Sequence, residues 1–257
     1  MKRAVVIILA GLLSSAMYAE TITVAAAISL KDALTKVSEQ YKVETGDSVE
    51  LNWGSSGQLA TQILNGAPVD LFISAAEKQI KDLSKAGVLV ETTRSIVATN
   101  SLVVIVPSES NASPDSVKAL ADRQVTRIAI GQPESVPAGR YAEQAFAHAG
   151  ITKEVRDKLI LGTNVRQVLD YVERGEVSAG LVYATDAKLA GDKIRLTCTV
   201  DAGEHEPIVY PAVVVKTSAK QEAAARFLKY LLSKKGQACL REFGFAPPPE
   251  PTTKAIK

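Results

Sequence analysis

The chain has 257 residues, of which 46% are hydrophobic and 23% are charged, and its formal net charge is +2. This length suits one large α/β domain or two lobes of about 100–150 residues, with a core that needs no disulfide or metal to hold it together. A chain this close to neutral, without a basic stripe or interleaved aromatic residues, argues against nucleic acid as a partner.

The first 19 residues have the pattern of a secretory signal peptide. Lys2 and Arg3 precede an apolar run over residues 4–13, and small residues then lead to Ala19. Because a membrane span needs roughly 20 apolar residues, an uncleaved anchor is the weaker interpretation. We expect cleavage after Ala19, with Ala16 as the alternative, and export to a bacterial periplasm. Removal of the signal peptide takes the formal net charge to about zero.

The first half of the mature chain alternates strands with amphipathic helices, and a glycine follows each helix. The expected strands are residues 21–26, 49–53 and 70–74, and the expected helices are residues 30–45, 59–65 and 77–86. This order predicts a largely parallel sheet that is covered on both faces. Ser29 is expected to cap the first helix, with Asp32 at the capping-box position.

The second half continues the alternation with shorter elements. The expected strands are residues 101–107, 127–131, 179–183, 194–200 and 211–215. The expected helices are residues 116–120, 138–149, 153–159, 165–174 and 185–190, followed by the last helices within residues 221–242. The proline-rich residues 246–252 are expected to form a poorly ordered tail.

These elements fall into two groups, which predicts two α/β lobes joined by crossover strands. One lobe would hold residues 20–98 and 211–257, and the other residues 99–210. A ligand should then bind between the lobes, at the carboxyl ends of the strands. Cys198 and Cys239 would lie in different lobes. An oxidising compartment permits a bridge between them, but a bridge there would hinder lobe movement, and two unlinked thiols are at least as compatible with the sequence.

Small neutral residues stand where strands run into helices. Examples are Ser29, the Gly-Ser-Ser-Gly segment at 54–57, and residues 131–139. The first N–H groups of a helix have no partner within the helix, and the helix dipole favours negative charge there. Several such helix starts could bind a small anion without arginine or lysine. Taken alone, however, Ser29 also suits a plain helix cap and Ser56 a plain turn.

At these residues the chain resembles the periplasmic molybdate-binding proteins of ABC importers. The resembling segments are residues 23–30, 53–60, 66–75, 131–141, 164–166, 180–183 and 210–211, in the same order. The resemblance implies the two-lobed type II periplasmic binding-protein fold. It also implies molybdate or tungstate as the ligand, a membrane permease of an ABC importer as the partner, and a monomer.

The resemblance further assigns the ligand contacts, which are hydroxyl and backbone N–H from Ser29 and Ser56, backbone N–H from Ala138 and Val165, and the phenolic O–H of Tyr183. It implies no resident cofactor, and molybdenum held only as its oxyanion without direct metal ligands. Gly57 departs from the family pattern, in which a serine is common at this position. Arg140 and Arg166 are interpreted as charges that support the field without touching the ligand.

A site made only of donors also restricts the anion, because a protonated oxyanion would point a donor at a donor. Sulfate has no such proton, so only cavity size would exclude it, and a sulfate-binding protein remains the alternative. An enzyme is not expected. The sequence has no Gly-x-Ser-x-Gly elbow, and its two histidines, His148 and His205, belong to no catalytic or metal-binding pattern.

Overall fold

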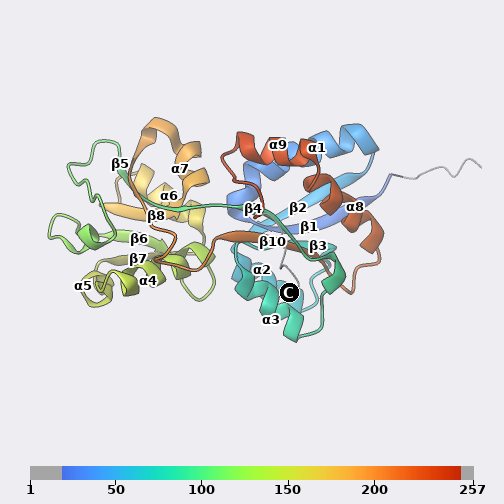
Figure 1. The fold of residues 1–257 in the computed structure, drawn as a ribbon, viewed down its shortest axis with the longest axis horizontal. Helices are drawn as coiled ribbons and strands as arrows, with labels where there is room; N and C mark the ends of the chain where they lie inside the picture. Colours follow the sequence, from blue (N-terminus) through green and yellow to red (C-terminus); the bar gives the residue numbers. More distant parts are fainter. Residues whose placement is uncertain (1–18, 250–257) are drawn as a thin grey trace, which may run out of the picture.

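A computed structural model describes residues 19–249, which form two α/β lobes side by side along the long axis of the molecule (Figure 1). The first lobe contains a five-stranded sheet in the order β2-β1-β3-β10-β4. Its strands are β1 (Thr21–Ala27), β2 (Ser48–Gly54), β3 (Leu71–Ile73), β4 (Ser95–Thr99) and β10 (Val209–Val214). The type II binding-protein architecture predicted above is therefore present.

The second lobe contains a five-stranded sheet in the order β7-β6-β8-β5-β9. Its strands are β5 (Leu102–Pro107), β6 (Ile128–Gly131), β7 (Leu159–Gly162), β8 (Ala179–Tyr183) and β9 (Ile194–Thr199). The chain crosses between the lobes twice, once from β4 to β5 and once from β9 to β10 (Figure 1). The first crossing is formed by residues 100–101 and the second by residues 200–208.

Helices cover both sheets. The first lobe has α1 (Lys31–Thr45), α2 (Ser56–Leu64), α3 (Glu77–Lys85), α8 (Gln221–Leu231) and α9 (Lys234–Glu242), with the short 3₁₀ turns η1 (Ile28–Leu30) and η2 (Glu91–Thr93). The second lobe has α4 (Pro137–His148), α5 (Thr152–Arg156), α6 (Val165–Glu173) and α7 (Ala184–Ala190), with η3 (Lys118–Ala121) and η4 (Gly191–Lys193). In α6 the apolar residues recur at helical spacing and are buried, which is what seats the helix on its sheet.

Both sheets are mixed rather than largely parallel. β1 pairs in parallel with β2 and β3, and β6 pairs in parallel with β7 and β8. The strands that follow the crossings, β5 and β10, run antiparallel to both of their neighbours. The parallel expectation therefore holds only for the strands that precede helices within one lobe.

Several local predictions were wrong. Ser29 lies inside η1, and it does not cap α1, which begins after Leu30. The helix expected over residues 153–159 ends at Arg156, and β7 follows it. β4 was not anticipated. The last helical region breaks at Ser233, whose hydroxyl accepts from the Gly236 amide at 3.3 Å and so caps a new helix.

Both ends of the chain bear on earlier expectations. The signal peptide expectation concerns residues 1–18, which lie outside the described residues, as do residues 250–257. Ala246 pairs with Thr99 next to the first sheet, so the expected tail begins later than proposed.

Cys198 on β9 and Cys239 on α9 are free thiols in different lobes. Between residues 19 and 249, no helix combines the length and the apolar character that crossing a membrane requires.

Candidate functional site

Strand ends and helix starts converge where the two lobes meet. In the first lobe, β1 runs into η1 and β2 runs into α2. In the second lobe, β6 leads to α4, β7 to α6 and β8 to α7. Because each of these helices follows the carboxyl end of its strand, the first turns of the helices lie at the carboxyl edges of the sheets, where parallel α/β folds bind ligands.

A small cavity, here called the inter-lobe cavity, lies between these helix starts and has a volume of about 10 Å³. Its lining comprises Ala27, Ile28, Ser29, Gly54, Ser55, Ser56, Ala75, Val136, Pro137, Ala138, Val165 and Tyr183. All five site residues assigned from the sequence are therefore brought together, although Ser29 and Ser56 come from one lobe and the other three from the second. Seven of these lining residues are Gly, Ala or Ser, whose small side chains let the backbone approach a bound group closely.

Local sequence leaves backbone donors free at the helix starts. Ser55 caps α2 by accepting from the Gln58 amide at 3.4 Å, and Asn164 caps α6 by accepting from the Gln167 amide at 3.0 Å. These caps engage the third amide of each helix, so the first amides, those of Ser56 and Val165, stay outside the helical ladder. In α4 the first residue is a proline, so Ala138 carries the first N–H of that helix.

Two glycines allow the close approach that builds the inter-lobe cavity. A Cβ at Gly139 would lie 1.8 Å from the carbonyl oxygen of Gly131, and a Cβ at Gly57 would lie 2.6 Å from the backbone of Ser135. The Gly57 amide donates across the lobes to the Ser135 carbonyl at 2.9 Å. The departure from the family pattern at Gly57 thus has a steric reason, because second-lobe backbone occupies the space that a side chain would need.

Two hydroxyls on the lining, those of Ser56 and Tyr183, have a hydrogen that no described residue accepts, and that of Ser29 has a hydroxyl neighbour. Ser56 Oγ accepts from the Ala75 amide at 2.9 Å, and Ser29 Oγ lies 3.0 Å from Tyr210 Oη. Tyr183 Oη is buried and has no hydrogen-bond partner among residues 19–249. Burial raises the pKa of Tyr183 well above its ordinary value, so the phenol stays protonated and can donate. An unpaired buried hydroxyl costs free energy unless a bound group accepts from it.

Arginine charges stand beside the inter-lobe cavity but not on its lining. Arg166 Nη2 donates to Asp32 Oδ2 of the first lobe at 2.7 Å, and Arg166 Nε lies 2.7 Å from Asp186 Oδ1 of the second. Burial raises the pKa of Asp186 to about 6, while the Arg166 charge acts in the opposite direction. Two carboxylates therefore flank this guanidinium, and its ion pair with Asp32 joins the two lobes.

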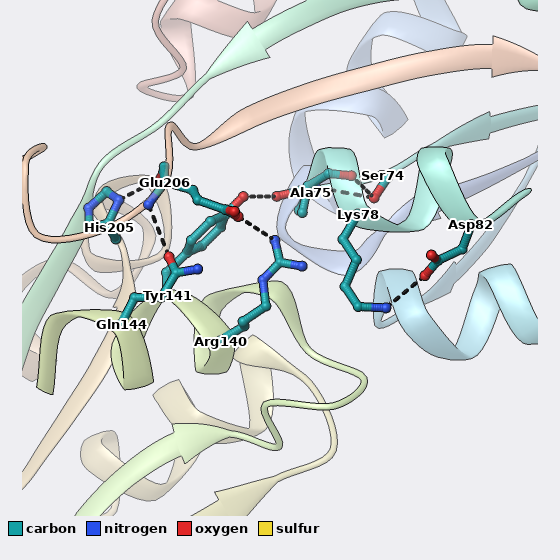
Figure 2. A network of polar contacts seen from close by, with 10 residues as sticks. Ser74, Ala75, Lys78, Asp82, Arg140, Tyr141, Gln144, His205 and Glu206 are labelled. Atoms are coloured by element: carbon teal, nitrogen blue, oxygen red, sulfur yellow. Dashed lines mark hydrogen bonds and ion pairs between the residues drawn. The ribbon is translucent and has the colours of Figure 1, made fainter. Parts of the chain in front are cut away.

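A second set of polar contacts surrounds Tyr141, which joins α4 to the first lobe (Figure 2). Tyr141 Oη donates to the Ala75 carbonyl at 3.3 Å, and Arg140 Nη2 lies 3.3 Å from Glu206 Oε2. The Glu206 amide donates to Gln144 Oε1 at 3.0 Å. Ala75 thus connects the inter-lobe cavity to these contacts, because its amide donates to Ser56 Oγ and its carbonyl accepts from Tyr141 Oη.

The histidines contribute no chemistry to the inter-lobe cavity. His205 Nδ1 lies 2.7 Å from the Glu206 carbonyl, and His148 is paired at 4.0 Å with Glu204. Neither side chain lines the inter-lobe cavity. Within the described part of the chain, no group of three or more His, Cys, Asp or Glu residues could hold a metal ion.

Comparison with known proteins finds a family and relatives that match most of the chain. The family described as bacterial extracellular solute-binding proteins matches residues 22–246. The molybdate-binding protein ModA of Haemophilus influenzae is 36% identical over 247 residues, covering 93% of this chain and 95% of that protein. ModA of Escherichia coli is 34% identical over 228 residues, covering 87% of this chain and 88% of that protein.

Solved structures agree in fold. The periplasmic molybdate-binding protein of Azotobacter vinelandii superposes with a TM-score of 0.80 at 27% identity, covering 89% of this chain and 100% of that chain. The sulfate-binding protein SubI of Mycobacterium tuberculosis superposes with a TM-score of 0.78 at 19% identity, covering 89% of this chain and 87% of that chain. The second likeness concerns the fold alone.

Proposed function

This chain belongs to the bacterial extracellular solute-binding proteins, and from that premise we propose that it binds molybdate and delivers it to the permease of an ABC importer. The observation that carries this proposal is the inter-lobe cavity, which joins helix starts from both lobes to the hydroxyls of Ser29, Ser56 and Tyr183. Relatives named for molybdate binding, matched over nearly the whole chain, support molybdate as the ligand. Tungstate, of similar size and the same charge, is proposed as a second ligand.

We propose that the ligand contacts are Ser29 and Ser56 through hydroxyl and amide, Ala138 and Val165 through amides, and Tyr183 through its hydroxyl. Roughly seven hydrogen bonds to a charged ligand, at about 1.5–3 kcal/mol each, give a gross term above about 10 kcal/mol. Association entropy and lobe closure offset several kcal/mol of this. A micromolar to nanomolar affinity follows without any salt bridge to the anion.

The proposed function also implies an oligomeric state, a location and a movement of the two lobes. We infer a monomer that acts in the periplasm after cleavage near Ala19, carries no resident cofactor, binds no nucleic acid and catalyses no reaction. We also propose that residues 20–98 with 211–257 move as one lobe and residues 99–210 as the other. Closure of these lobes on the anion would create the surface that the permease recognises.

A thermal-shift panel on the mature protein tests the ligand assignment. Because a ligand that binds only the native state stabilises it, about 100 Kd of ligand should add ~2.7 kcal/mol to the free energy of unfolding. We expect a raised melting temperature with molybdate and with tungstate, and no comparable rise with hydrogen phosphate. A clear rise with sulfate and none with molybdate or tungstate would contradict the assignment and favour the sulfate alternative.

A further inference from the structure

A hydrogen-bonded series of polar side chains, made of the buried Ser29, Tyr210 and Thr185 and the half-buried Asn100, runs behind the inter-lobe cavity and connects the two lobes. Asn100 Nδ2 donates to Thr185 Oγ1 of α7 at 2.9 Å and to Tyr210 Oη at 3.2 Å. Tyr210 Oη in turn lies 3.0 Å from Ser29 Oγ. Asn100 stands between β4 and β5, and Tyr210 lies on β10, so both lie in or next to the segments that cross between the lobes.

The direction of each hydrogen bond in this series follows from the donors available. Asn100 Oδ1 accepts from the Ser101 amide at 2.9 Å, which turns Nδ2 toward Tyr210. An amide nitrogen can only donate, so Tyr210 Oη accepts from it. The hydrogen of Tyr210 then has Ser29 Oγ as its one partner among residues 19–249, and leaving it unpaired in a fully buried place would be costly.

Ser29 therefore accepts from Tyr210, and its own hydrogen is left for the inter-lobe cavity that it lines. Ser56 is set in the same way, because its oxygen accepts from the Ala75 amide. The two serines thus face the ligand as donors, but by different means. A backbone amide orients Ser56, whereas two side chains in or next to the crossing segments orient Ser29.

We propose that Asn100 and Tyr210 are specificity-determining positioning residues, which hold the Ser29 hydroxyl as a donor and make the site reject oxyanions that keep a proton. This inference rests on the proposed function. Hydrogen phosphate carries the same two negative charges as molybdate in mildly alkaline solution, but its O–H needs an acceptor. With Ser29, Ser56 and Tyr183 all turned to donate, that O–H would meet another donor.

Because its ring is packed on several sides, Tyr210 can lose its hydroxyl oxygen alone, and this makes the proposal testable. Tyr210 is fully buried, and its ring centroid lies 6.0 Å from that of Tyr183 and 5.4 Å from that of Phe245, both in edge-to-face arrangements. The ring is therefore held by its neighbours as well as by its hydroxyl. Tyr210→Phe keeps these ring contacts and removes the hydroxyl that donates to Ser29 and accepts from Asn100, which still has Thr185 Oγ1 as a partner. The Ser29 hydroxyl then becomes free to turn and accept.

The test measures dissociation constants for molybdate and for hydrogen phosphate by calorimetry in mildly alkaline buffer. For Tyr210→Phe we expect molybdate binding to weaken by about tenfold and hydrogen phosphate binding to stay equal or improve. The ratio of the two affinities should then fall by about tenfold or more. Tyr141→Phe is the matched control, because it also removes a buried interface hydroxyl but one bonded to the Ala75 carbonyl, and its ratio should match that of the unmodified protein.

Asn100→Asp tests the direction of the hydrogen bonds that run from Asn100 through Tyr210 to Ser29. A carboxylate can only accept, so Tyr210 would donate to it, Ser29 would donate to Tyr210, and the lone pairs of Ser29 would face the inter-lobe cavity. The added charge repels two dianions alike, so the affinity ratio reports the reversal. We expect this ratio to fall further than in Tyr210→Phe. Asn100→Asp also decides the question if the Tyr210→Phe protein does not fold.

The outcomes separate the inference from the proposed function. Failure of the unmodified protein to bind molybdate would overturn the proposed function. Molybdate binding with an unchanged ratio in the folded Tyr210→Phe and Asn100→Asp proteins would overturn the positioning role alone. An equal fall of the ratio in Tyr141→Phe would also overturn it, because loosening of the lobe interface would then explain the effect.

Discussion

The two lobes offer donors of different kinds to the inter-lobe cavity. The first lobe presents the hydroxyls of Ser29 and Ser56, whose oxygens are already engaged by Tyr210 and by the Ala75 amide. The second lobe presents the first amides of α4 and α6, together with a Tyr183 hydroxyl that has no partner in the described residues. Hydroxyl donors depend on neighbours for their direction, whereas helix amides are aimed by the fold itself.

Removing both first-lobe hydroxyls should have the largest effect on molybdate binding. The double variant Ser29→Ala with Ser56→Ala loses two hydrogen bonds to a charged ligand, which at about 1.5–3 kcal/mol each amounts to about 3–6 kcal/mol of binding free energy. We expect a folded protein whose melting temperature no longer rises with molybdate. An unchanged rise would mean that the anion binds elsewhere.

Removing one second-lobe amide should have a smaller effect. Asn164 is extended, with φ −160° and ψ 170°, a conformation that suits a residue before proline, and Val165 is the first residue of α6. Val165→Pro should therefore keep the helix but lose the amide, weakening molybdate binding by about 1.5–3 kcal/mol. Val165→Ala loses side-chain packing but keeps the amide, so calorimetry should find its affinity closer to that of the unmodified protein. Equal losses in both would argue against the amide contact.

Tyr183→Phe should separate binding from stability. Losing the hydroxyl should weaken molybdate binding by up to about 3 kcal/mol, yet raise the free energy of unfolding without ligand by about 1 kcal/mol, because an unpaired buried polar group is removed. Urea denaturation with and without molybdate measures both quantities. A ligand-free protein that is less stable than the unmodified one would show that the hydroxyl has a structural partner instead.

The smallest effect concerns pH. Burial raises the pKa of Tyr183, so this donor stays protonated past the range in which an exposed phenol begins to ionise, and burial raises the pKa of Asp186 to about 6. From about pH 7 to about pH 9 neither group should change its charge, and molybdate affinity measured by calorimetry should stay constant. A steady loss of affinity across that range would indicate that Tyr183 ionises early or that a cation holds the anion.

Part of this site has local signals in the sequence. Strands that end in small residues and helices that begin with them are visible within ten residues of chain, so Ala138 and Val165 could be placed at helix starts and Ser56 in the turn before one. Their selection as ligand contacts, like that of Tyr183, came from the family resemblance, because an amide donor leaves no trace in the side chain. Antiparallel β5 and β10 could not be foreseen in the same way, since their partners are distant in sequence. β7 is only four residues long and directly follows a helical segment, which hid it.

Ser29 shows where the local signal misleads. A serine before a helix predicts a cap, but here the chain first makes the turn η1, and the hydroxyl contacts Tyr210, 181 residues away. Asn100 and Tyr210 carry no local pattern that indicates a ligand site. Only the double crossing between the lobes brings them behind Ser29.

The central claim is that neutral donors from both lobes bind one molybdate between them. A calorimetric titration of the mature protein with molybdate, repeated with sulfate, tests it most directly. We expect one site per chain, and a dissociation constant for molybdate that lies between micromolar and nanomolar and below that for sulfate. No heat with molybdate, or tighter binding of sulfate, would contradict it.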